Sequence, residues 1–259
     1  MTASAAFMRH LAEIAAAETL PRFRQAGAVA NKLAQGFDPV TEADRETERA
    51  IRHAIRAAFP EDGILGEEHG LENPESARRW IIDPIDGTRS FISGIPLWGT
   101  LVGLTVDGDA VAGMMAQPFT REIFYTEAGQ AFYEGPGDGG QRRLSTRRTT
   151  DLSAATLCTT TPAYFRGRAA EAYAGLEKKV RLARYGTDCY AYAMIAAGHV
   201  DLVVETGLQP YDIVALIPII EMAGGVVTDW EGGPAEKGGA IIAAATPELH
   251  RAASAILRG

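Results

Sequence analysis

The sequence predicts an α/β protein whose first half is α+β, and two apolar patterns support this. The first part of the chain has amphipathic helices followed by apolar strands with tight turns, which indicates helices packed on a largely antiparallel sheet. The second part alternates strands with helices, which is typical of an α/β layer. A Gly- and Arg-rich segment, residues 135–148, separates the two patterns. We therefore expect an N-terminal lobe over residues 1–144 and a C-terminal lobe over residues 145–259.

Two helices open the chain. Residues 4–24 repeat apolar side chains at helical spacing (Phe7, Leu11 and Ile14), which predicts an amphipathic helix. Residues 41–44 read Thr-Glu-Ala-Asp, which resembles a capping box with Asp in place of the usual Glu. A second helix is therefore expected to begin near residue 41.

Apolar strands follow these helices. Short strands are expected at residues 64–66 and 80–82, and more strands between residues 97 and 133. Asp-Gly at 107–108 and Ala-Gly at 128–129 lie between apolar runs and predict hairpin turns.

The second half is expected to contain five strands and four helices in alternation. The strands are expected near residues 156–160, 180–185, 200–205, 225–228 and 240–244, and the helices near residues 169–179, 189–197, 211–223 and 247–257.

Composition excludes several classes of protein. The 259 residues include 25 Lys and Arg against 33 Asp and Glu, and the formal net charge of −8 argues against binding to nucleic acid. No apolar run approaches the roughly 20 residues that span a bilayer. Two cysteines and no apparent secretory signal favour a cytoplasmic protein without a disulfide framework. A phosphate held by such an acidic protein needs cations or backbone dipoles.

Residues 80–88 carry the strongest chemical signal, and they read Trp-Ile-Ile-Asp-Pro-Ile-Asp-Gly-Thr. Asp83 and Asp86 follow an apolar strand, with a proline between them. Two carboxylates on rigid backbone suit a hard cation such as Mg²⁺. The backbone N–H groups of Gly87 and Thr88 suit a phosphate. The segment predicts metal-assisted phosphate chemistry.

Two further acids could complete the metal site. Glu67 follows a strand and a glycine, and Asp212 stands at the start of a predicted helix, where the helix dipole favours a carboxylate. Each also has a structural interpretation, because Gly-Glu-Glu is common in solvated turns and Asp is a common N-cap. Two cations about 4 Å apart would let one activate water while the other steadies the leaving oxygen.

These motifs resemble the inositol monophosphatase superfamily of Mg²⁺-dependent phosphatases. The resemblance spans most of the chain and rests on residues 38–44, 66–68, 80–88, 210–212 and 224–225. It implies a layered αβαβα fold like that of the inositol monophosphatases and fructose-bisphosphatases. It also implies hydrolysis of a phosphomonoester by a metal-activated water, with two or three Mg²⁺ in each site and Mn²⁺ as a substitute. A homodimer is expected.

The resemblance assigns roles by position. The implied metal ligands are Glu67, Asp83, Asp86, Asp212 and the carbonyl group of Ile85. The implied catalytic residues are Asp44, Glu67 and Thr88, with Thr88 and Asp44 orienting the attacking water. The substrate is expected to meet the backbone N–H groups of Gly87 and Thr88 as well as Asp86 and Asp212. Asp44 also has a structural interpretation, since it can complete the cap of the second helix.

Within the superfamily, the sequence is most similar to the bacterial histidinol-phosphate phosphatases. Residues 89–100, 184–192 and 201–205 follow the pattern of that branch. Histidinol phosphate carries an ammonium and an imidazole group, so its site needs acids away from the metals. Asp188 and Glu205 are candidates for those acids. Asp188 could instead cap the helix that follows it, and Arg184 is a further candidate for substrate contact that could equally be a solvated or ion-paired side chain.

The expected activity is hydrolysis of L-histidinol phosphate to L-histidinol and phosphate, in histidine biosynthesis. The alternative enzyme is an inositol-1-phosphate phosphatase, or a phosphatase for another small ester such as fructose-1,6-bisphosphate or 3′-phosphoadenosine 5′-phosphate. A non-catalytic regulator that binds a phosphorylated ligand is the alternative from another class. The complete set of acids argues against the regulator.

Overall fold

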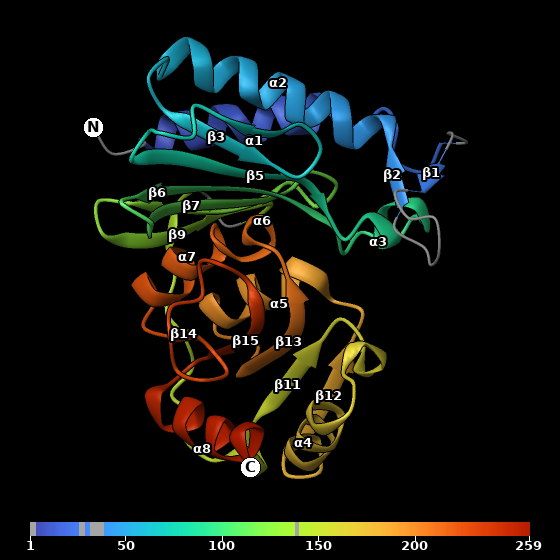
Figure 1. Ribbon diagram of the computed structural model, residues 1–259, viewed down its shortest axis with the longest axis vertical. Helices are drawn as coiled ribbons and strands as arrows, with labels where there is room; N and C mark the ends of the chain where they lie inside the picture. The colour runs from blue at the N-terminus through green and yellow to red at the C-terminus, as the bar shows by residue number, and fades with distance from the viewer. Residues whose placement is uncertain (1–3, 26–28, 32–38, 138–139) are drawn as a thin grey trace.

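A computed structural model describes residues 4–25, 29–31, 39–137 and 140–259. The chain stacks into five layers, in which helices, a large sheet, helices, a smaller sheet and helices follow one another (Figure 1). The layered αβαβα prediction is confirmed. Asp38, the first residue of one predicted motif, lies outside the described residues.

The larger sheet has eight strands and is antiparallel except where β3 and β5 run parallel. Its strands, in spatial order, are β10 (Arg142–Arg143), β9 (Gln130–Glu134), β8 (Glu122–Glu127), β7 (Asp109–Gln117), β6 (Gly99–Val106), β5 (Arg78–Asp86), β3 (Gly63–Gly66) and β4 (Gly70–Glu72). Helices α1 (Ala5–Thr19) and α2 (Glu42–Ala58) cover its outer face (Figure 1). A separate hairpin pairs β1 (Val29–Asn31) with β2 (Pro39–Thr41).

The smaller sheet has five strands and is mixed, because β15 runs antiparallel to both of its neighbours. Its strands, in spatial order, are β12 (Leu182–Tyr185), β11 (Thr156–Thr159), β13 (Leu202–Leu208), β15 (Gly239–Ala244) and β14 (Val226–Asp229). The remaining helices are α3 (Thr88–Ile92), η1 (Leu152–Ala154), η2 (Pro162–Tyr164), α4 (Arg168–Glu177), α5 (Asp188–Ala196), α6 (Pro210–Ile213), α7 (Leu216–Met222) and α8 (Pro247–Arg258).

The predicted helix over residues 211–223 is wrong as a single element, because the chain forms two short helices, α6 and α7. Pro218 has no N–H, so it cannot bond the carbonyl group of Val214 four residues earlier, and the helix breaks there. The break also brings the backbone of Ala215 against the large sheet. A Cβ atom at Gly113 would overlap the carbonyl group of Ala215, so this approach requires glycine.

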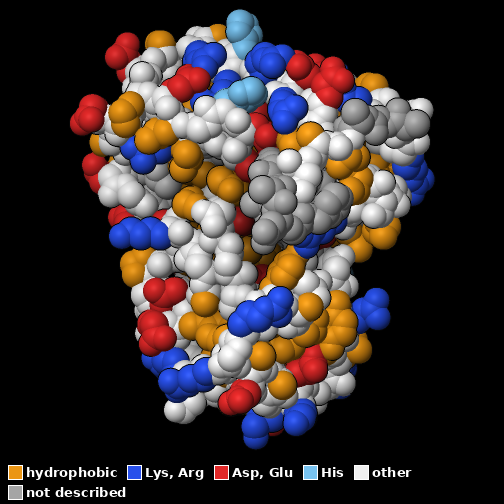
Figure 2. All heavy atoms as spheres, turned by 45° about the vertical axis from the view of Figure 1, so that its right-hand side comes forward, with side chains coloured by type: hydrophobic (Ala, Val, Ile, Leu, Met, Phe, Trp, Pro, Cys, Tyr) orange, Lys and Arg blue, Asp and Glu red, His pale blue; other side chains and the backbone are white. Residues whose placement is uncertain are grey.

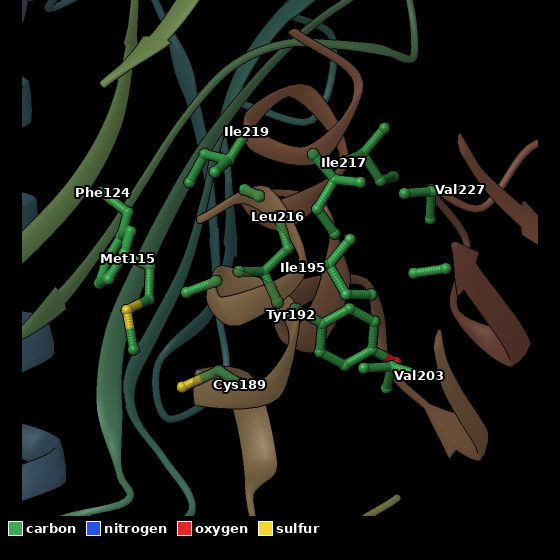
Figure 3. Close-up of a cluster of buried hydrophobic side chains, with 14 of the residues drawn as sticks. Met115, Phe124, Cys189, Tyr192, Ile195, Val203, Leu216, Ile217, Ile219 and Val227 are labelled. Carbon is green, nitrogen blue, oxygen red and sulfur yellow. The ribbon is translucent and has the colours of Figure 1, made fainter. Parts of the chain in front are cut away.

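The two sheets share one buried core (Figure 3). Met115 and Phe124 from the large sheet pack in the same cluster as Ile195 of α5, Leu216 of α7 and Val203 of β13. This cluster contains residues from both sides of position 144. The division into an N-terminal lobe (1–144) and a C-terminal lobe (145–259) stays a prediction, because the two segments share this core.

Two simpler expectations concern membrane and disulfide chemistry. Among the described residues, no helix is long and apolar enough to cross a membrane. Cys158 and Cys189 are both buried free thiols.

The close approach at Gly113 predicts a loss of stability in Gly113→Ala. The added methyl group would force the sheet and the α6–α7 junction apart, and overpacking of this kind costs about 1–3 kcal/mol of unfolding free energy. Urea unfolding measures the change. Gly175→Ala in α4 is the matched control, because its new Cβ would meet only ordinary contacts and Ala is the better helix former. Equal stability of Gly113→Ala and the unchanged protein would contradict this packing.

Candidate active site

A bulge in β5 brings the two central carboxylates to one side of the strand. Asp83 pairs with Leu101 of β6, whereas Asp86 pairs with Gly99, so β5 has one extra residue in this interval. Positions three apart in a regular strand face opposite sides, and one extra residue restores the shared side. The strand predicted over residues 80–82 is therefore too short, because β5 continues through Asp83 to Asp86. The intervening proline is tolerated at a bulge.

Asp212, on helix α6, lies close to these two residues of β5. Carboxylate oxygens of Asp83, Asp86 and Asp212 all lie within 4.8 Å of one another. Asp212 is held by a capping box in α6, where its Oδ2 accepts the N–H of Gln209 at 2.6 Å. Its capping and cluster positions are compatible.

The cluster lies in a cavity of roughly 600 Å³. In Figure 2, acidic side chains are visible set back between the upper and lower parts of the molecule. The lining contains most of the predicted site: Glu67, Asp83, Ile85, Asp86, Gly87, Thr88, Asp188, Glu205 and Asp212. It also contains Arg89, Thr160, Tyr164, Thr206, Gly207, Leu208, Gln209 and Tyr211.

Both interpretations of Asp44 are compatible with the structure. Its Oδ2 accepts the Thr41 N–H at 2.8 Å and the Thr41 hydroxyl at 2.5 Å, which completes the cap of α2. Its Oδ1 lies 3.4 Å from Oγ1 of Thr88. The same Thr88 hydroxyl lies 3.1 Å from the carbonyl oxygen of Ile85, so its single proton has an acceptor on either side.

Gly87 turns the chain from β5 into α3. It adopts a left-handed conformation with φ 81°, and it is the N-cap of α3. A Cβ atom there would lie 3.0 Å from Oδ2 of Asp188, so glycine also allows the two parts of the chain to approach. Thr88 is the first residue of α3, so its N–H group lies at the N-terminal end of that helix.

Asp188 does not cap α5. Its Oδ2 accepts the hydroxyl of Ser90 at 2.8 Å, whereas the N–H of Cys189 is donated to Oδ2 of Asp86 at 2.6 Å. The capping interpretation of Asp188 is therefore wrong, and the N-terminus of α5 faces a carboxylate from the other sheet. Asp188 has a φ of 42°, which is unusual for a residue other than glycine and indicates a constrained position.

Glu205 is buried in β13 of the smaller sheet, and like Asp188 it lines the cavity. Its Oε1 accepts the N–H of Thr160 at 2.5 Å, and its Oε2 accepts the hydroxyl of Thr159 at 3.1 Å. Burial raises the pKa of Glu205 to about 7, with the Asp188 charge adding to the rise and the threonine hydrogen bonds opposing it. Ser90 and Thr160 were not predicted as site residues, because only the folded chain places them beside these acids.

The electrostatics of the cluster fit a cation. Burial raises the pKa of Asp83 well above its usual range, and the charges of Glu67, Asp86 and Asp212 raise it further. Burial likewise raises the pKa of Asp86, with the charges of Asp188 and Asp212 adding to it. Crowded carboxylates are costly to ionise together, and a divalent cation removes that cost. Oxygen ligands of this kind suit Mg²⁺, Mn²⁺ or Ca²⁺.

The structure does not bring Arg184 to this cavity. Arg184 is exposed on β12 and is absent from the residues that line the cavity. An arginine that does line the cavity is Arg89 of α3. Its guanidinium lies 5.5 Å from the ring centre of Tyr164. Both of these side chains line the cavity, Arg89 from α3 and Tyr164 from η2.

Comparisons of sequence and of structure with known proteins both find phosphatases. A sequence model of the inositol monophosphatase family matches residues 3–258. The bifunctional phosphatase IMPL2, chloroplastic, of Arabidopsis thaliana is 43% identical over 198 residues, which are 76% of this chain and 56% of that protein, less than two thirds of its length. The histidinol-phosphatase of Chlorobaculum parvum is 38% identical over 196 residues, which are 75% of this chain and 73% of that protein. A solved inositol monophosphatase from Zymomonas mobilis is 36% identical, with 100% of each chain covered and a TM-score of 0.86.

The raised pKa values of Asp83 and Asp86 predict how the stability of the metal-free protein depends on pH. In the unfolded chain these groups ionise near pH 4, before they ionise in the folded protein. Their contribution to stability is therefore present below about pH 4 and falls as the pH rises toward the raised pKa values of the folded protein. A cation bound to the ionised cluster restores it, so Mg²⁺ should raise the unfolding temperature more at pH 8 than at pH 5. Equal shifts at both pH values would contradict a carboxylate metal site.

Asp86→Asn should separate the effect of the Asp86 charge on stability from its effect on Mg²⁺ binding. Loss of one charge should raise the unfolding temperature of the metal-free protein at pH 8, with about 2–4 °C expected for each kcal/mol gained in a chain of this size. The same variant should lose the rise caused by Mg²⁺. Asp109→Asn, at an exposed position at the start of β7, is the matched control and should keep that rise. Thermal unfolding followed by circular dichroism measures both effects.

Proposed function

The chain belongs to the inositol monophosphatase family of phosphatases, and from this premise we propose that it is a Mg²⁺-dependent phosphomonoesterase that hydrolyses L-histidinol phosphate. The observation that carries the choice of substrate is the pair of acids, Asp188 and Glu205, on the cavity wall beside the metal cluster. The carboxylate cluster of Asp83, Asp86 and Asp212 supports metal-dependent phosphate hydrolysis. The pair of acids supports a substrate whose alcohol part carries positive charge.

The proposed metal ligands are the carboxylates of the cluster, Glu67 and the carbonyl group of Ile85. All of them line the same cavity, and they offer only the oxygen atoms that Mg²⁺ prefers. When bound, Mg²⁺ would lower the pKa of a water molecule and offset the negative charge of the phosphate. Burial and neighbouring charges raise the pKa values of Asp83 and Asp86, and a bound cation would favour their ionised forms.

Thr88 and Asp44 are proposed to orient the attacking water. The Thr88 hydroxyl can donate its proton to Asp44 or to the carbonyl group of Ile85, which leaves its lone pairs directed to other donors. A water molecule can then donate to Thr88 and point its own lone pair at phosphorus. The backbone N–H groups of Gly87 and Thr88, at the start of α3, are proposed to hold the phosphate oxygens. Positioning of this kind is a main source of rate gain in phosphoryl transfer.

Asp188 and Glu205 are proposed to bind the part of the substrate that carries no phosphate. Histidinol phosphate carries an ammonium group and an imidazole group, and a carboxylate forms charge-assisted hydrogen bonds with either. Glu205 is held by Thr159 and Thr160, and Asp188 by Ser90, so both carboxylates are fixed before substrate arrives. Inositol phosphate offers only neutral hydroxyl groups to the same acids.

The comparisons support a phosphatase, and the relatives carry the names of more than one substrate. The Chlorobaculum parvum relative is named a histidinol-phosphatase, and the Zymomonas mobilis structure is named an inositol monophosphatase. Inositol-1-phosphate is therefore the second candidate. A cytoplasmic location, a homodimer and a role in histidine biosynthesis stay predictions.

The direct test is phosphate release from a panel of esters with Mg²⁺ present. We expect kcat/KM for L-histidinol phosphate to exceed that for inositol-1-phosphate and fructose-1,6-bisphosphate by about 10-fold or more, since one charge-assisted hydrogen bond contributes about 1.5–3 kcal/mol. A preference for inositol-1-phosphate would overturn the substrate assignment. Absence of turnover on every ester would favour the non-catalytic regulator.

Glu205→Gln sharpens the same test. It should lower kcat/KM for histidinol phosphate by about 10-fold and leave p-nitrophenyl phosphate, which has no cationic group, nearly unchanged. Because the pKa of Glu205 is about 7, KM for histidinol phosphate should fall as the pH rises from 6 to 8 in the unchanged protein. The variant should lose this dependence. Glu171→Gln, at an exposed position in α4, is the control, and equal losses on both esters would remove Glu205 from substrate binding.

A further inference from the structure

Glu48 and Arg52 form a buried ion pair in contact with the turn that carries Glu67. Glu48 is fully buried and Arg52 is 2% exposed, although both lie on α2. Nε of Arg52 lies 2.7 Å from Oε1 of Glu48. Charged side chains are rarely buried so completely without a specific partner, and their partners here lie on the β3–β4 hairpin.

Glu48 holds the backbone immediately after Glu67. Its Oε2 accepts the N–H of Glu68 at 2.6 Å, and its Oε1 accepts the N–H of His69 at 3.2 Å. A Cβ atom at Gly66 would overlap the Glu48 carboxylate, so the glycine before Glu67 leaves the space that this contact occupies. The residues on either side of Glu67 are thus fitted to Glu48.

Arg52 fixes Glu48 and the end of the same turn. Its Nη2 donates to the carbonyl oxygen of Gly70 at 2.5 Å, and its Nη1 lies 3.0 Å from Glu72 of β4. On the other side, the N–H of Glu67 is donated to the carbonyl oxygen of Ile82 at 3.2 Å, next to Asp83 in β5. Glu67 is therefore held between α2 and the strand that carries the central carboxylates.

We propose that Glu48 and Arg52 are positioning residues that fix Glu67 for metal binding. Asp44 and Glu48 are one turn apart on α2, so a single helix orders both the Thr88 side of the cavity and the Glu67 side. The inference rests on the proposed role of Glu67 as a metal ligand. Outer contacts that orient metal ligands typically change metal affinity by about 10-fold or more.

The test is Mn²⁺ affinity, measured by calorimetry on the metal-free protein, for the unchanged chain and for Glu48→Gln. The variant preserves the shape of the side chain, and Arg52 keeps Glu72 as a partner. We expect Mn²⁺ affinity to fall by about 10-fold. The control is Glu46→Gln on the same helix, which breaks a part-exposed pair with Arg49 away from the turn and should leave affinity unchanged.

The outcomes separate the two proposals. If the unchanged protein binds no Mn²⁺, the proposed function fails. If it binds Mn²⁺ and folded Glu48→Gln binds equally well, with or without a lower unfolding temperature, Glu48 is structural only and the positioning role is overturned. If Glu48→Gln does not fold, Glu48→Asp, which withdraws the carboxylate from the turn by one methylene, decides by the same measurement. Unchanged affinity in that variant overturns the positioning role as well.

Discussion

Repulsion among carboxylates in the cavity is the constraint on which the rest of this structure depends. Asp83, Asp86 and Asp212 place their oxygen atoms within 4.8 Å of one another, and the first two have raised pKa values because they are buried together. Ionising these groups in the folded protein costs stability, because their pKa values are raised, so the surrounding structure has to hold the cluster together. A divalent cation that turns the repulsion into attraction gives the arrangement its chemical use.

The fold supplies that restraint from several directions. The bulge in β5 fixes Asp83 and Asp86 on one side, and the short helix α6 fixes Asp212 through its capping box. The N-terminus of α5 donates the N–H of Cys189 to Asp86, which joins the two sheets at the cluster itself. The shared core between the sheets then keeps these elements from separating. Each acid is therefore held by backbone rather than by a flexible side chain contact.

The sequence indicates which acids to examine because each stands beside a local marker, such as the proline and glycine around Asp86, and Asp83, Asp86 and Asp212 lie together in the structure. It predicts less where a role depends on contacts between distant segments. Asp188 has the sequence position of a helix cap, and only the approach of Ser90 from the other half shows a different use. Glu48 and Arg52 have the spacing of an exposed i, i+4 pair, so nothing in the sequence separates them from a solvated helix face. Arg184 matches a family pattern, yet it lies on an exposed strand edge outside the cavity.

The central claim is that these carboxylates converge to hold divalent cations. Anomalous X-ray scattering from crystals of the protein grown with Mn²⁺ tests it most directly, because Mn²⁺ is located without reference to activity. The account predicts anomalous peaks between Asp83, Asp86 and Asp212, with distances of about 2.0–2.6 Å to carboxylate oxygens, as hard cations require. Peaks confined to other surfaces of the molecule, with this cavity free of metal at millimolar Mn²⁺, would contradict it.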